Sequence, residues 1–251
     1  DGGAYTITVD ATNLADNKTL TLTENVYGKS VFVVTNLQGD LNASALGDSV
    51  SATAASGSGF AVSMTAGAGD DILTGGAGAD TITGGSGADI FVFSSSIANG
   101  SDTITDFSVS QGDKLNLSGI SSTSFTLYNG DLGYFVSNPD VNSISTADVN
   151  IGGTVVRIYS ALDGPTDMDT ASEIAGLING SSNAFSMSAN AESIIIAGDD
   201  NPSGTTAEVN YIWHVKDTGD GFIQDGEISL LATLSGNGWS TDDLGAGNFI
   251  L

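Results

Sequence analysis

Short runs of alternating apolar and polar residues cover most of the chain, and helical periodicity is nearly absent. In residues 1–65 the β-type runs are YTITV, TLTLTE, SVFVVT, SVSAT and FAVSMT, and the turns between them carry DN, GD and GSG. Alternation of this kind indicates strands with one buried face. We therefore expect an all-β fold.

The β-type runs from residue 49 onward are spaced as in a solenoid, in which each run forms part of one coil. Runs begin near residues 49, 60, 71, 80 and 89, a nearly constant period of the kind that solenoids show. Met64 is in phase with Leu73, although Val62 stands where the later runs carry an acid. We expect residues 1–65 to form solenoid-like β coils that lack the acid. A small β-sandwich with turns at similar spacing is the alternative.

Residues 66–92 consist of three nine-residue units in a row: AGAGDDILT, GGAGADTIT and GGSGADIFV. The sixth place of each unit is an acid: Asp71, Asp80 and Asp89. The eighth place is apolar: Leu73, Ile82 and Phe91. A flexible glycine-rich linker has no reason to keep acids and large apolar residues in phase. Each unit therefore predicts a glycine-rich turn of six residues and a strand of three.

These units resemble the nonapeptide repeats of the RTX (repeats-in-toxin) family, which form a calcium-binding parallel β-roll. The resemblance implies that two units make one coil, so that Asp71 and Asp89 lie on neighbouring turns. Ca²⁺ takes six to eight oxygen ligands at about 2.3–2.6 Å, and carboxylates and turn carbonyls would supply them. The implied metal-binding positions are Gly67, Gly69, Asp71, Gly76, Gly78, Asp80, Gly85, Gly87 and Asp89.

Residues 93–120 contain a D-x-I-x-D-F element followed by G-D-K-L-N-L-S, similar to the segment that closes the calcium roll in RTX proteins. By that resemblance Asp102 and Asp106 contribute carboxylates to the last turns, and residues 66–120 form one roll. Ile104 and Phe107 would cap the stack, because the end of a solenoid exposes unpaired backbone. An ordinary hairpin with surface acids is the alternative.

Residues 121–251 predict further β structure, with one short helix at about 170–178. Thr170 would cap this helix, with Glu173 as its capping-box partner. His214, the single histidine, lies in the strand-like run NYIWHV, and we interpret it as structural.

The stretch from 217 to 227, DTGDGFIQDGE, partly resembles an EF-hand calcium loop. When Glu227 takes the twelfth place, a glycine falls at the sixth and an isoleucine at the eighth, as that loop requires. Lys216 and Thr218 then occupy the first and third places, where acids belong. The candidate ligands are Asp217, Asp220 and Glu227. A plain acidic turn between two strands is the alternative.

The chain is strongly acidic, with 30 acids against five scattered bases and a net charge of −25. The absence of a basic patch argues against nucleic acid and anionic lipid as partners. The acids favour bound cations, although a solubilising or salt-adapted surface is the alternative.

No cysteine is present, which excludes disulfides and thiol chemistry. The apolar runs are too short to span a bilayer.

The sequence has no G-x-S-x-G, H-E-x-x-H or P-loop motif, so we expect no catalytic residues, no organic cofactor and no enzyme activity. The terminal LGAGNFIL resembles the uncleaved signal of substrates of the type I secretion apparatus. The chain begins at Asp1, and we expect it to be a C-terminal fragment.

The resemblance implies a calcium-dependent folding and export module of a secreted bacterial surface protein, either an adhesin or a surface-layer protein. Its implied partner is the type I secretion apparatus. One alternative is the tail of a type I-secreted protease, lipase or polysaccharide-modifying enzyme. Another is a self-associating array protein.

Overall fold

A computed structural model describes residues 5–23, 30–55, 59–93, 100–120, 126–127, 149–150, 154–160, 169–179, 185–186, 190–199, 208–219, 223–236 and 244–251. The chain divides into two units. Unit 1 comprises Asp1–Ile120 with Gly247–Ile250, and unit 2 comprises Ser121–Ala246 with Leu251.

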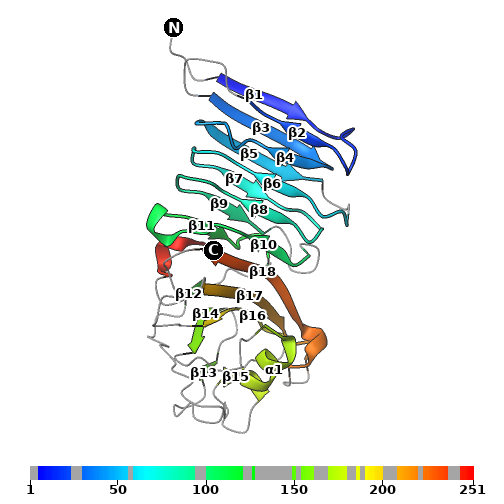
Figure 1. Ribbon diagram of the computed structural model, residues 1–251. Helices are drawn as coiled ribbons and strands as arrows, with labels where there is room; N and C mark the ends of the chain where they lie inside the picture. The colour runs from blue at the N-terminus through cyan, green and yellow to red at the C-terminus, as the bar shows by residue number, and fades with distance from the viewer. Residues whose placement is uncertain are drawn as a thin grey trace. The chain divides into compact units, whose positions relative to one another are not determined.

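Unit 1 is built from short strands that alternate between two sheets (Figure 1). The first sheet contains, in order, β1 (Tyr5–Asp10), β3 (Ser30–Leu37), β5 (Ser49–Ala54), β7 (Ile72–Thr74), β9 (Ile90–Val92), β11 (Lys114–Asn116) and β19 (Phe249–Ile250). The second contains, in order, β10 (Asp102–Ile104), β8 (Thr81–Thr83), β6 (Ser63–Thr65), β4 (Asp40–Asn42) and β2 (Thr19–Thr21). A 3₁₀ turn, η1 (Val109–Gln111), precedes β11.

Strands in both sheets pair in parallel with the strand two steps along the chain. In the first sheet Leu73 lies opposite Phe91, and in the second Met64 lies opposite Ile82. This pairing confirms the predicted parallel β-roll in which alternate units stack. It begins at β1, so the described strands of residues 1–65 form coils and not a sandwich. β10 and β11 pair with β8 and β9 and not with each other, so the hairpin alternative is wrong.

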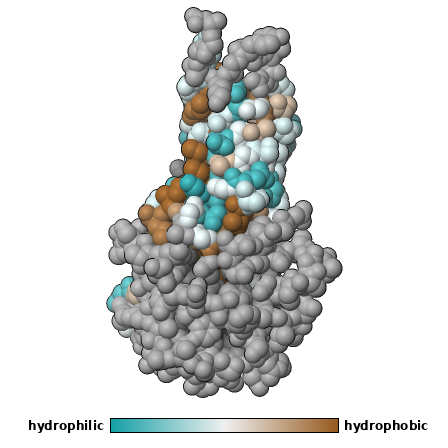
Figure 2. All heavy atoms as spheres, turned by 90° about the vertical axis from the view of Figure 1, so that its left-hand side faces the viewer, coloured by the Kyte–Doolittle hydropathy of each residue, from teal (hydrophilic) through white to brown (hydrophobic). Residues whose placement is uncertain are grey.

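One apolar side chain from each short strand points into the roll, because side chains alternate across a strand. Leu73, Ile82 and Phe91, the predicted apolar positions of the repeats, are all buried, and so is Met64. The outward positions are more polar. Figure 2 shows weakly polar and hydrophilic atoms over much of the described surface of unit 1, with apolar patches between them.

The two ends of the roll differ. Near the later end Phe107 is buried and packs against Phe91, with ring centroids 6.0 Å apart, and Ile104 is buried too. Their role as a cap of the stack stays a prediction. β19 adds a further parallel strand beyond β11, so the last residues of the chain extend the first sheet. At the other end Tyr5 and Ile7 of β1 are 53% and 39% exposed.

Unit 2 contains a sheet with the order β12 (Thr126–Leu127), β14 (Thr154–Ser160), β16 (Glu192–Asp199), β17 (Glu208–Lys216) and β18 (Ile228–Gly236). The first three strands are parallel, and β16, β17 and β18 are antiparallel. A small parallel pair joins β13 (Val149–Asn150) to β15 (Phe185–Ser186), and a 3₁₀ turn lies at η2 (Asp225–Glu227). Another 3₁₀ turn, η4 (Ala246–Asn248), directly precedes β19 of unit 1.

Helix α1 (Ala171–Asn179) is the one α-helix among the described residues, and it lies where the sequence predicted a helix. The Glu173 N–H donates to Thr170 Oγ1, and Glu173 Oε2 accepts from the Thr170 N–H. This is the predicted capping box. No helix among the described residues has the length and apolar character needed to cross a bilayer.

Glycine is required at Gly85 because φ is 104° and a Cβ there would lie 1.9 Å from the Gly67 carbonyl oxygen of the stacked turn. We predict that Gly85→Ala destabilises the calcium-loaded roll by at least about 2 kcal/mol. Ser86→Ala, in the same turn, should leave it nearly unchanged. Urea unfolding in excess calcium measures both variants, and equal stability of the two would contradict the stacking described here.

Candidate metal centre

An acid directly precedes each of several strands in the first sheet, and its carboxylate binds the coil before. Asp71 Oδ1 accepts a hydrogen bond of 2.6 Å from the Val50 N–H, and Asp89 Oδ1 accepts one of 2.9 Å from the Asp71 N–H. The same contact recurs from the Asp89 N–H to Asp113 Oδ1 at 3.0 Å. These residues form a ladder of carboxylates along one side of the roll, which we call the first ladder.

The second sheet carries a shorter ladder of the same kind. Asp80 Oδ1 accepts from the Val62 N–H at 2.7 Å, and Asp102 Oδ1 accepts from the Asp80 N–H at 3.0 Å. Val62, which the sequence places where an acid belongs, thus offers only its backbone. We call Asp80 and Asp102 the second ladder.

The ladder carboxylates are buried, with Asp71, Asp80, Asp89, Asp102 and Asp113 between 0% and 3% exposed. Burial raises the pKa of Asp71 and of Asp80 to about 6, that of Asp89 to about 7 and that of Asp102 to about 8. It raises the pKa of Asp113 too. Neighbouring carboxylates add to the shift at Asp89 and Asp102. The ion pairs among the described residues lie on β16 and β17, so no base neutralises the ladders there.

Each ladder also holds a carboxylate oxygen without a partner. Asp71 Oδ2 and Asp80 Oδ2 are buried and accept no hydrogen bond. Beside the second ladder, a Cβ on Gly75 would lie 2.6 Å from Asp80 Oδ2 and 3.0 Å from Asp102 Oδ2, so only glycine leaves room for both oxygens. In each ladder, a buried carboxylate oxygen without a hydrogen-bond partner or a nearby base fits a hard cation.

Backbone carbonyls would have to supply the remaining ligands. No group of three or more His, Asp or Glu side chains gathers into a metal site in the described ranges. The predicted glycines do lie against carbonyl groups of stacked turns. A Cβ would fall within 2.3 Å of such an oxygen at Gly67, Gly78, Gly85 and Gly87, near Asp48 backbone atoms at Gly69, and near Ala54 at Gly76. The mixture of carboxylate and carbonyl oxygens fits Ca²⁺.

The predicted ligand Asp106 belongs to neither ladder by its hydrogen bonds, although its charge lies close enough to the first ladder to help raise the pKa of Asp89 and of Asp113. Its Oδ1 accepts from the Gly84 N–H at 2.9 Å and its Oδ2 accepts from the Gly85 N–H at 2.7 Å. Both of its oxygens therefore hold a turn of the preceding coil. This contact stabilises the turn whether or not Asp106 also meets a cation.

Two ladder residues were missed by the sequence reasoning. Asp113 extends the first ladder beyond Asp89, and its Oδ2 also accepts from the Ser108 N–H at 2.8 Å. Asp48 Oδ2 accepts from the Ser30 N–H at 2.7 Å and begins the ladder. An acid directly before a strand was the available signal, but neither residue has the complete glycine-rich turn.

The 217–227 segment has the geometry of a capped turn. The two oxygens of Glu227 accept from the Thr218 N–H at 2.7 Å and the Gln224 N–H at 2.9 Å. The Thr218 side chain first, and then these N–H groups, lower the pKa of Glu227. Asp217 is buried, with Oδ1 bonded to the Gly219 N–H and Oδ2 unpartnered. Asp220 lies outside the described residues. Metal binding by these three acids therefore stays a prediction.

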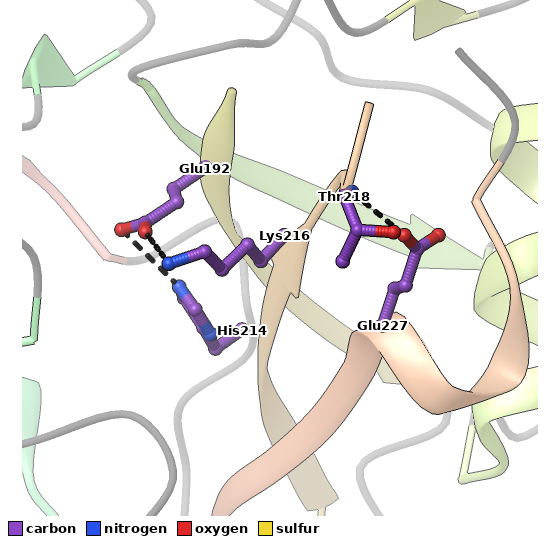
Figure 3. Close-up of polar contacts among 5 residues, drawn as sticks. All are labelled: Glu192, His214, Lys216, Thr218 and Glu227. Atoms are coloured by element: carbon purple, nitrogen blue, oxygen red, sulfur yellow. Dashed lines mark hydrogen bonds and ion pairs between the residues drawn. The ribbon is translucent and has the colours of Figure 1, made fainter. Parts of the chain in front are cut away.

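Lys216, at the first place of that loop, points to Glu192 instead (Figure 3). Its Nζ lies 2.7 Å from Glu192 Oε1, and His214 Nε2 lies 3.6 Å from Glu192 Oε2. His214 is buried, and burial lowers its pKa although Glu192 opposes the shift. A buried histidine that faces Glu192 within a sheet agrees with the structural interpretation.

The raised pKa values predict how pH acts on the calcium-free roll. Because Asp71, Asp80, Asp89 and Asp102 titrate at about 6 to 8 when folded, against an ordinary 3.8, the folded state binds more protons than the unfolded chain. The stabilisation is complete below the unfolded pKa and is lost as pH rises through about 6 to 8.

In chelator, the unfolding midpoint in urea should therefore fall as the pH rises from about 5 to about 9. Asp102→Asn, which keeps the shape without the charge, should flatten the upper part of that curve. A chelated protein that is most stable at the alkaline end would contradict the burial of these carboxylates.

Comparison with known proteins agrees with this geometry. The family model of the RTX calcium-binding nonapeptide repeat, in four copies, matches residues 63–94. Searches of curated proteins and of solved structures returned no match. The matched residues span β6 to β9 and include Asp71, Asp80 and Asp89. This part of the chain is therefore an RTX β-roll, and its repeats bind Ca²⁺.

Proposed function

We propose that this chain is a non-enzymatic, calcium-dependent folding and export module of a type I-secreted bacterial surface protein, an adhesin or a surface-layer protein. The observation that supports it is the pair of buried carboxylate ladders, whose charges no described base neutralises. A cation is the missing partner, and the repeats bind calcium.

Without calcium the balance of free energies opposes folding of the roll. Two or three of the nine residues in each unit are glycine, which lose the most backbone entropy on ordering. Each unit buries only one large apolar side chain in return: Leu73, Ile82 or Phe91. Burying unpaired carboxylates costs further free energy at neutral pH. The free energy of calcium binding therefore drives the folding of the roll.

This coupling suits export. Extracellular calcium modules bind at about 10⁻⁴–10⁻³ M, well above the free calcium of a bacterial cytosol. Inside the cell the roll would remain unfolded and able to pass through a narrow channel. Outside, calcium would fold it and oppose backward movement through the channel.

The C-terminal residues fit the same proposal. The LGAGNFIL segment, which resembles a type I signal, contains β19, and Phe249 pairs with Leu115 at the end of the roll. Asn248 Nδ2 also donates to the Asp113 carbonyl at 2.9 Å. The proposed signal would thus be free while the roll is unfolded and would join the first sheet after calcium folds it.

Calcium should act as a folding switch for residues 66–120. In chelator we expect fast hydrogen exchange across this range, and in millimolar calcium we expect strong protection, because the ladders need the cation. Hydrogen exchange with mass spectrometry, followed through a calcium titration, measures it. Equal protection in chelator and in calcium would contradict the folding switch. It would show that the roll is stable without calcium.

The stability of a variant that lacks a ladder carboxylate should respond to calcium differently from that of a variant that lacks a core side chain. Asp80→Ala removes one ligand from the second ladder, so excess calcium should restore part of the lost stability. Leu73→Ala removes core packing worth about 2–5 kcal/mol, which calcium does not specifically restore. Thermal unfolding at increasing calcium compares them, and parallel responses would show that Asp80 does not act through the metal.

A further inference from the structure

The outward positions of the second sheet form two straight columns of small polar side chains. The first column runs through Thr19, Asp40, Ser63, Thr81 and Thr103, and the second through Thr21, Asn42, Thr65, Thr83 and Thr105. On the three successive strands β6, β8 and β10, with the residue that follows β10, every outward position is a hydroxyl. We call these six the hydroxyl face: Ser63, Thr65, Thr81, Thr83, Thr103 and Thr105.

Strand propensity alone does not account for this face. The first sheet offers the same kind of outward position, from strands of the same length in the same repeats, and fills it differently. Its outward residues on β7, β9 and β11 are Ile72, Thr74, Ile90, Val92, Lys114 and Asn116. β-Branched residues suit both sheets equally. The restriction to hydroxyls is therefore a property of one face.

The hydroxyl face is neutral, although the chain carries a net charge of −25. An acidic or basic partner would find no complementary charge on it. Charged groups also hold their hydration water in fixed orientations, which disturbs any ordered layer of water. A neutral array of hydroxyls and methyl groups suits a neutral and ordered partner.

The geometry of the hydroxyl face is regular and rigid. Neighbouring strands lie about 4.7–4.9 Å apart, and alternate residues along a strand lie about 6.6 Å apart, so the side chains of this face leave the backbone at the points of a nearly rectangular grid. Threonine is stiff at χ1, so ordering its side chain costs little entropy. Within the second column Thr83 Oγ1 and Thr105 Oγ1 lie 2.7 Å apart and hold each other by a hydrogen bond. The grid therefore exists before any partner arrives.

From these features we infer that the hydroxyl face binds crystalline water, the surface of ice. Hydroxyl-bearing side chains at regularly spaced positions hold a layer of water by hydrogen bonds that are enthalpically close to direct ones. The methyl groups of threonine occupy the spaces between these waters. A layer ordered on such a grid can join the lattice of an ice surface. Asp40 and Asn42 interrupt the grid at β4, and Thr19 and Thr21 resume it at β2.

The test is adsorption of the calcium-loaded full chain to ice, together with its thermal hysteresis. Thr83→Tyr places a bulky ring on the grid but keeps a hydroxyl and a good strand former. Thr74→Tyr is the matched control, because Thr74 holds the same ninth place of its unit on the opposite sheet. The calcium-induced circular dichroism of each variant reports folding, and so separates loss of ice binding from failure of the calcium roll.

The inference predicts that the wild-type chain and Thr74→Tyr bind ice, whereas Thr83→Tyr falls to the level of a buffer control. Thr81→Tyr, with Ile72→Tyr as its control at the seventh place, repeats the comparison at more exposed positions. A folded wild-type chain without ice affinity would overturn the inference, as would equal effects of the two tyrosines. Retention on crystalline cellulose or chitin without ice affinity would overturn it in favour of a polysaccharide.

Discussion

The roll depends on the hydrogen bond that a backbone N–H of one coil donates to a buried aspartate of the next coil. It fixes the stacking distance and register of glycine-rich turns that have little side-chain packing of their own. It also brings acids together along each side of the roll, as in the contact of Asp89 with the Asp71 N–H. The same contact that aligns the coils therefore concentrates negative charge, and this conflict makes the fold depend on calcium.

Because of this conflict, the stability of the roll depends on the compartment in which the chain lies. The raised pKa values of Asp89 and Asp102 show that burial disfavours their charged forms when no metal is present. At neutral pH the calcium-free roll must either take up protons or remain unfolded. A cation relieves this constraint, so the calcium concentration of a compartment decides which state predominates. Outside the ladders the second sheet is free to present a neutral surface.

Much of this could be predicted from the repeats because their signal is local and periodic. The phase of Leu73 and Phe91 gave the stacking of alternate units, and Thr170 with Glu173 gave the start of α1. Two features escaped prediction because they depend on distant pairing. Asp113 acts on a coil 24 residues earlier without a complete repeat around it. Phe249 pairs with Leu115 across more than half of the chain, through a strand of two residues.

The most direct test of the central claim is a crystal structure of the calcium-loaded chain, with the ions located by their anomalous scattering. Calcium should lie between stacked turns, in contact with the free oxygens of Asp71 and Asp80 and with carbonyls of the glycine-rich turns. The contact distances should be about 2.3–2.6 Å. Well-ordered turns in millimolar calcium with only water beside Asp71 and Asp80 would contradict the account.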